Sequence, residues 1–169
     1  MPHVASLAYK LADLERGPAD RFSRVAVDRV TLVVGHGIAH DTKGRSDSRQ
    51  RNVLLFETVE RLRGEGFHTK PGELGEQVVI AGLPSEIALP GARLLVGESA
   101  IIELVYYRIP CGRFARIQGQ PKDLARERIG FMARVLVGGE FAIGSPVSVM
   151  SIAEARISER GDAGDQRTT

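Results

Sequence analysis

Cysteine is nearly absent from this sequence, which has a single one, Cys111, among its 169 residues. One cysteine excludes a disulfide within the chain and a metal site built from cysteine ligands alone. A lone thiol is either a small buried apolar residue or a reactive group. Free cysteine is often buried, so composition by itself favours the buried interpretation.

Long apolar runs are also missing. The longest, such as Val30 to Val34, are far too short to cross a bilayer. The start, Met1-Pro2-His3-Val4, lacks the basic residues and apolar stretch of a signal peptide. We therefore expect a cytoplasmic protein with no membrane partner.

A large charge excess is missing as well, because 23 basic residues are interspersed with 21 acidic ones. A dedicated nucleic-acid binder would concentrate basic charge on one face, so no nucleic-acid partner is expected. Arginine greatly outnumbers lysine. Arginine suits bidentate recognition of phosphate or carboxylate, although genome composition explains the same bias equally well.

The sequence has many turn formers, 19 glycines and 8 prolines, which divide it into short segments. Most segments have the character of strands, and Ile102, Leu104 and Tyr106 are predicted to share one face. The expected strands are Val4 to Tyr9, Arg24 to Val34 (two strands or one bent strand), Val78 to Ile80, Ala92 to Val96, Ala100 to Arg108, Phe131 to Val137 and Pro146 to Met150. So many short strands indicate a closed barrel or a sandwich.

Two helices are expected between the strands. The first contains Leu55, Val59 and Leu62 at helical spacing, and Glu57 can pair with Arg61 one turn on. A shorter helix is expected from Pro121 to Arg128. We predict one domain over residues 1–152 and a tail over 153–169. The segment from Ser151 to Arg160 is compatible with a helix, and Gly161 to Thr169 is expected to be disordered.

The first candidate for chemistry is Cys111. Pro110 cannot donate a ladder hydrogen bond, so it should end the strand and place Cys111 on the loop beyond. Arg108 and Arg113 flank the thiol, and nearby cations favour the nucleophilic thiolate. The residues alone do not choose between this reactive thiol and one tucked under the rim of the barrel.

The second candidate is the loop from Gly35 to Arg51, which is rich in glycine, hydroxyl, histidine and arginine side chains. These are the materials of an anion-binding loop, and Arg49 and Arg51 would point to one face of a following strand. A solvated surface loop is the alternative. His36, His40 and Asp41 lack a further ligand at a recognisable spacing, so a metal site is not predicted here.

The third candidate is the segment from Pro71 to Gln77, whose glycines imply a tight turn. Glu76 offers an acceptor there, and Gln77 offers both a donor and an acceptor. This signal is weak when it is taken alone.

Taken in order, these segments resemble the MOSC domain, named for the C-terminal region of molybdenum-cofactor sulfurase. The resemblance covers about residues 4 to 150 and departs from the family pattern at Gln77, which is usually asparagine, and at Ser145, which is usually aspartate. The matching segments are Gly37-Ile38-Ala39-His40-Asp41, Ser48 to Leu55, Pro71-Gly72 with Gly75-Glu76-Gln77, Gly82-Leu83, Pro110-Cys111 and Ala133 to Gly139 followed by Gly144.

The resemblance implies a mainly β protein, a closed or partly open barrel with a few short peripheral helices. It also implies that Cys111 carries sulfur as a persulfide or ligates molybdenum in a molybdenum–pterin cofactor, which agrees with the softness of a thiolate. The implied cofactor-binding residues are Arg49, Arg51 and Arg108 for anionic groups, Glu76 and Gln77 for the shape of the pocket, and His40 and Asp41 from the first loop.

The implied partner is a sulfur donor such as a cysteine desulfurase, or else a redox partner. Pyridoxal phosphate belongs to a companion desulfurase domain and is not expected to bind here, since Lys10, Lys43, Lys70 and Lys122 include no convincing Schiff-base lysine. Two alternatives stay open: a molybdenum-dependent reductase of N-hydroxylated compounds, and a non-catalytic barrel that binds an anion or a partner. The sequence does not predict the oligomeric state.

Overall fold

The structure is a computed structural model that describes residues 1–11, 22, 24–42 and 51–151. It is mainly β, as expected. The strands are β1 His3–Tyr9, β2 Val25–Ala26, β3 Arg29–Val33, β4 Gly37–Ile38, β5 Arg51–Leu55, β6 Val78–Ala81, β7 Arg93–Val96, β8 Ala100–Tyr107, β9 Phe131–Val137, β10 Gly139–Ala142 and β11 Val147–Val149. The helices are α1 Phe56–Gly64, α2 Gly112–Gln118 and a 3₁₀ turn, Lys122–Ala125.

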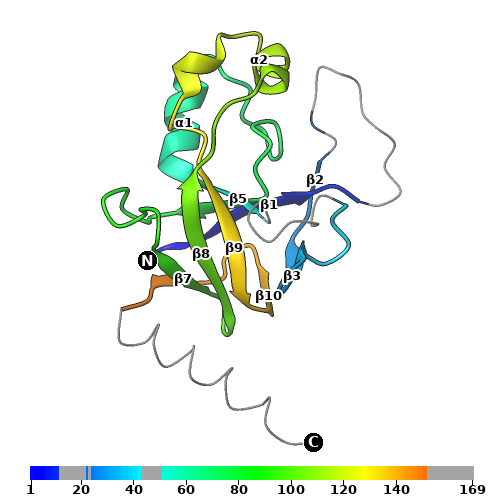
Figure 1. Ribbon diagram of the computed structural model, residues 1–169, viewed down its shortest axis with the longest axis vertical. Coiled ribbons are helices and arrows are strands. Elements are labelled where there is room, and N and C mark those ends of the chain that lie inside the picture. Colours follow the sequence, from blue (N-terminus) through cyan, green and yellow to red (C-terminus); the bar gives the residue numbers. More distant parts are fainter. Residues whose placement is uncertain (12–21, 23, 43–50, 152–169) are drawn as a thin grey trace, which may run out of the picture.

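Eight strands form one sheet in the order β11-β7-β8-β9-β5-β6-β1-β2, which curls into a half-barrel (Figure 1). Strands β10, β3 and β4 form a second, three-stranded sheet. Strands β5 and β6 run parallel, and such a pair requires a crossover connection. Here the crossover contains α1 and the turn that includes Pro71 to Gln77. The partly open form of the expected barrel is therefore confirmed.

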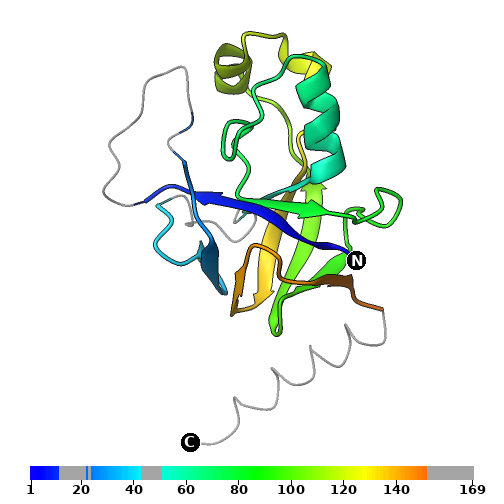
Figure 2. The ribbon, with the colours of Figure 1, turned by 180° about the vertical axis from the view of Figure 1, so that it is seen from behind.

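The helices lie at one end of the half-barrel, beyond the end of β8, in both views (Figures 1 and 2). One apolar cluster fills the inside of the sheet, with Ile80, Leu94 and Leu104 fully buried. A second cluster joins α1 and α2 to the other face of the sheet through Leu62 and Phe114. This second cluster fixes the segment that follows β8.

Three predictions about local structure are wrong. Tyr106 is exposed, because the pairing of β8 with β9 shifts register between Leu104 and Tyr106 and so interrupts the alternation. The second predicted helix is only the 3₁₀ turn Lys122–Ala125, and α2 was not predicted at all. Its signal was present, since Phe114, Ile117 and Gln118 are buried at helical spacing and Gly119 ends the helix in the left-handed conformation.

The predicted ion pair between Glu57 and Arg61 does not form. A Glu57 carboxylate oxygen instead accepts a hydrogen bond of 2.7 Å from the backbone N–H of Gly82. Within the described ranges, no helix is long and apolar enough to cross a membrane. The predicted tail, residues 153–169, lies outside the described residues.

Candidate functional site

Cys111 is exposed, at the junction between β8 and α2. Strand β8 ends at Tyr107, three residues connect it to the cysteine, and Cys111 is the N-cap residue of α2 with an extended backbone. Its neighbour Pro110 is buried, whereas Ile109 is 75% exposed. The buried interpretation that composition favoured is therefore wrong, and the thiol is open to solvent.

Arg108 projects inward from the same segment. Its guanidinium donates a hydrogen bond of 2.6 Å to the backbone carbonyl of Leu74. The guanidinium carbon also lies 5.9 Å from the ring centroids of both Phe22 and Phe114, within the range of cation–π attraction. This contact joins the cysteine segment to the turn before β6.

Gly75 makes room for Arg108. A Cβ atom at this position would lie 2.8 Å from Nη2 of Arg108 and 3.0 Å from the ring of Phe22. The backbone of Gly75 also has a φ of +78°, which side-chain-bearing residues rarely adopt. Both observations explain why the turn contains glycine at this position.

Arg108 belongs to a cluster of charges with Arg24, which is half-buried like Arg108, and Glu76, which is buried. Burial lowers the pKa of Arg108 to about 10, and repulsion from Arg24 acts in the same direction, while attraction to Cys111 and Glu76 opposes it. Burial also raises the pKa of Glu76, against a hydrogen bond from the backbone N–H of Gly72. The thiol therefore interacts electrostatically with a guanidinium that is poorly solvated.

Gln77 connects this cluster to Asp41, which lies in the predicted loop from Gly35 to Arg51. Its Nε2 donates to the Asp41 carboxylate at 2.5 Å, and its Oε1 accepts from the backbone N–H of Asn52 at 3.0 Å. The Asn52 side chain in turn donates to the Gly75 carbonyl at 3.1 Å. The glutamine that departs from the family pattern therefore spans two partners, and both it and Asp41 are buried.

Three buried polar atoms in this region have no hydrogen-bond partner within the described part of the chain: Nη1 of Arg24, Oε2 of Glu76 and Oδ1 of Asn52. Buried polar groups are usually satisfied, so these atoms mark a polar interior with unused donor and acceptor capacity. Electrostatic attraction links Arg24 to Asp41 and Glu76 and opposes the lowering of its pKa by burial.

Sequence reasoning missed Arg24. It lines a cavity of about 250 Å³ whose basic members also include His68 and Lys70. Its backbone position is fixed by the Pro71-Gly72 turn, since a Cβ on Gly72 would lie 2.7 Å from the Cβ of Arg24. No local motif marks Arg24, because its charged neighbours come from segments that are distant in the sequence.

The structure gives fewer contacts for the remaining predicted site residues, which are His40, Arg51 and Arg49. His40 is exposed with a φ of +66°, and its side chain is not part of the cluster. Arg51 begins β5 opposite Ala133, and Arg49 lies outside the described residues. Among residues that are described, no group of three or more histidine, cysteine, aspartate or glutamate side chains could hold a metal ion.

The fold has clear structural relatives. YuaD from Bacillus subtilis matches with a TM-score of 0.71 and 20% identity, over 88% of this chain and 96% of that one. YiiM from Geobacillus stearothermophilus matches with a TM-score of 0.67 and 17% identity, over 89% and 76% of the two chains. YiiM from Escherichia coli gives 0.66 and 18%, over 89% and 70%.

No curated protein matches the chain in sequence. The model of the MOSC domain does match, over residues 43–148. This region spans more than half of the chain and contains Glu76, Gln77, Arg108 and Cys111. The protein belongs to the MOSC-domain family.

Proposed function

We propose that the protein is a sulfur carrier that accepts sulfur on Cys111 as a persulfide and delivers it to an acceptor. The observation that carries this proposal is the combination of an exposed thiol with the half-buried guanidinium of Arg108, which interacts with it electrostatically. A cation favours the thiolate and also the persulfide anion that replaces it. Exposure allows a macromolecular or small donor to reach the sulfur.

The chemistry needs no additional oxidant. The Cys111 thiolate attacks the terminal sulfur of a donor persulfide, so that a new S–S bond forms at Cys111 while the S–S bond of the donor breaks. The donor leaves as a thiolate. In the second step an acceptor nucleophile attacks the terminal sulfur on Cys111, which leaves as the thiolate that began the cycle.

A cysteine desulfurase is the class of donor that fits this first step, because it supplies persulfide sulfur. The cluster of Arg24, Arg108 and Glu76 would act as a positioning group in this scheme. It anchors the segment of Cys111 to the turn before β6 through the contact between Arg108 and Leu74.

Binding of a molybdenum–pterin cofactor is the second candidate function. A soft thiolate suits molybdenum, and the unused buried donor of Arg24 suits an anionic substituent. The residues present therefore fit the group: Cys111 would ligate the metal and Arg24 and Arg108 would hold anionic atoms. When bound, the cofactor would supply two-electron redox chemistry.

Metal and pterin analysis separates the two candidates. The protein is purified from a host that makes the molybdenum cofactor, together with the Cys111→Ser variant. Molybdenum and pterin near one equivalent, lost in the variant, would favour the cofactor role. Absence of molybdenum and pterin, together with sulfur uptake that depends on Cys111, would favour the sulfur carrier. If Cys111→Ser retained all ligand binding, a non-catalytic barrel would be favoured instead.

A further inference from the structure

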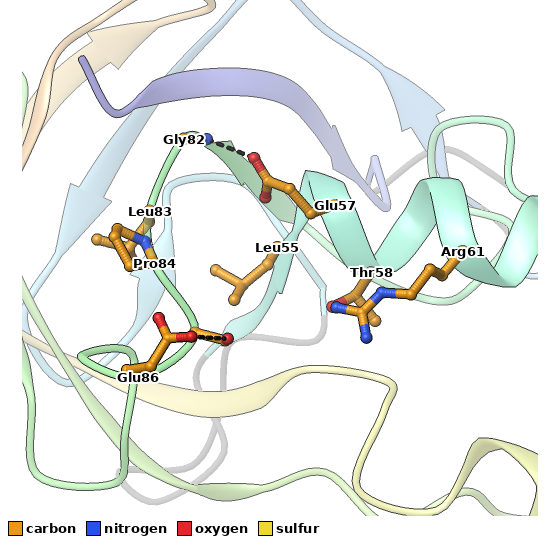
Figure 3. A pocket seen from close by; sticks show the side chains of 9 residues that line it. Leu55, Glu57, Thr58, Arg61, Gly82, Leu83, Pro84 and Glu86 are labelled. Atoms are coloured by element: carbon orange, nitrogen blue, oxygen red, sulfur yellow. Dashed lines mark hydrogen bonds between the residues drawn. The ribbon is translucent and has the colours of Figure 1, made fainter.

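A cleft separate from Cys111 lies between α1 and the loop that follows β6. It has two adjoining parts of about 310 and 240 Å³, which share Leu55, Thr58, Arg61 and Ser85 as lining residues. Figure 3 shows Arg61 and Thr58 on the helix side of the first part, with Glu86 on the loop side across the cleft. Neither part is lined by Cys111, Arg24 or Arg108.

Arg61 is the cation of this cleft whose guanidinium forms no hydrogen bond or ion pair within the described part of the chain. Its charge attracts the carboxylate of Glu65, which is itself paired with Arg128. The other arginine of the cleft, Arg128, is fully engaged, since it forms two hydrogen bonds with Glu65 and one with the carbonyl of Leu124. An incoming anionic group would therefore meet Arg61, beside the hydroxyl of Thr58.

Carboxylates outnumber guanidinium groups among the residues that line the cleft, three to two. Glu57 and Glu86 line the first part of the cleft, and Glu127 lines the second. Three carboxylates repel a simple anion such as phosphate, whereas Arg61 repels a simple amine. A ligand with one carboxylate and one ammonium group satisfies both signs of charge.

The floor of the cleft is apolar. Leu55 and Leu83 are buried beneath the first part, and Pro84 forms its edge. Ligand sites typically combine such apolar lining with a few polar groups that set orientation. The floor would accommodate an aliphatic side chain while the charged groups at the rim hold the polar end of the same molecule.

We propose that this cleft binds a free α-amino acid with an aliphatic side chain. Arg61 and Thr58 bind the carboxylate, Glu86 binds the ammonium group, and the side chain packs on Leu55 and Leu83. The site is independent of the sulfur chemistry at Cys111, so either assignment can fail while the other stands.

Binding of L-leucine to the full-length chain is measured by NMR titration, following the amides of Thr58 and Ser85. Leucinamide lacks the carboxylate, and 4-methylpentanoate lacks the ammonium group. Each is expected to bind about fivefold more weakly than leucine, the effect of one exposed charge pair. Arg61→Gln should abolish the preference over leucinamide, and Glu86→Gln the preference over 4-methylpentanoate.

Arg63→Gln is the matched control, because Arg63 lies on the same helix but pairs with Glu60 and Thr69 outside the cleft. It should bind leucine like the unmodified protein, as should Cys111→Ser. Circular dichroism of every variant establishes that the fold is retained. The proposal is overturned if leucine produces no saturable shifts at these amides, or if either analogue binds as tightly as leucine.

Discussion

The guanidinium of Arg108 donates a 2.6 Å hydrogen bond to the backbone carbonyl of Leu74 and thereby ties the segment of Cys111 to the turn before β6. Leu74 is buried, so its carbonyl would be costly to leave without a donor. The relationship makes Arg108 both a structural anchor and the cation that interacts with the thiol.

Arg108→Gln should therefore lower both stability and thiol reactivity. Loss of a charged hydrogen bond to a buried carbonyl should reduce the free energy of unfolding by about 1–2 kcal/mol. Loss of the positive charge should slow alkylation of Cys111 by iodoacetamide, because Arg108 no longer attracts the sulfur electrostatically. Urea unfolding measures the first effect, and alkylation kinetics measure the second. An unchanged alkylation rate would show that Arg108 does not act on the Cys111 thiol.

Gly75→Ala tests the space that Arg108 occupies. An added Cβ would lie 2.8 Å from Nη2 of Arg108, and the positive φ adds strain. Gly91→Ala is the matched control, since Gly91 has a φ of +92° but no atom near the added Cβ. Positive φ alone should cost about 1–2 kcal/mol in both variants, and only Gly75→Ala should change the rate of Cys111 alkylation. Equal rates in both variants would contradict the account.

Stability should depend on the ionisation of Glu76. Burial raises its pKa in the folded chain above the unfolded value of about 4.3, so the folded chain binds the proton more tightly. The stabilisation that protonated Glu76 gives the folded chain is therefore fully present below the unfolded pKa. It is lost as pH rises through the folded pKa. Urea unfolding at a series of pH values should show this fall relative to Glu76→Gln, whereas Glu98→Gln should follow the unmodified protein. Parallel profiles for Glu76→Gln and the unmodified protein would contradict the prediction.

Asp41→Ala tests the hydrogen bond from Gln77. It removes the acceptor of the buried Nε2 group and one of the carboxylates that attract Arg24. An unsatisfied buried amide should reduce the free energy of unfolding by about 2 kcal/mol. Asp28 is exposed, so Asp28→Ala should change the free energy of unfolding by less than about 0.5 kcal/mol. Similar losses in the two variants would show that the Gln77 contact adds little.

The sequence predicted the strands well because their alternation and turn residues are local. It failed at Tyr106, where the partner strand imposes a register shift that the residues of β8 do not encode. The ordered motifs selected Cys111, Arg108, Glu76 and Gln77 as candidate site residues, and their roles stay predictions. Exposure of the thiol and the charged surroundings of Arg24 depend on the packing of distant segments, so no local pattern could establish either.

The central claim concerns sulfur on Cys111, and the single cysteine of the chain makes its measurement unambiguous. The folded protein and Cys111→Ser are treated with a low-molecular-mass persulfide, the excess is removed, and intact mass is recorded before and after an acceptor thiol is added. The account predicts a gain of one sulfur atom in the unmodified protein, its loss to the acceptor, and no gain in the variant. A folded protein that acquires no sulfur, although the denatured chain does, would contradict the account.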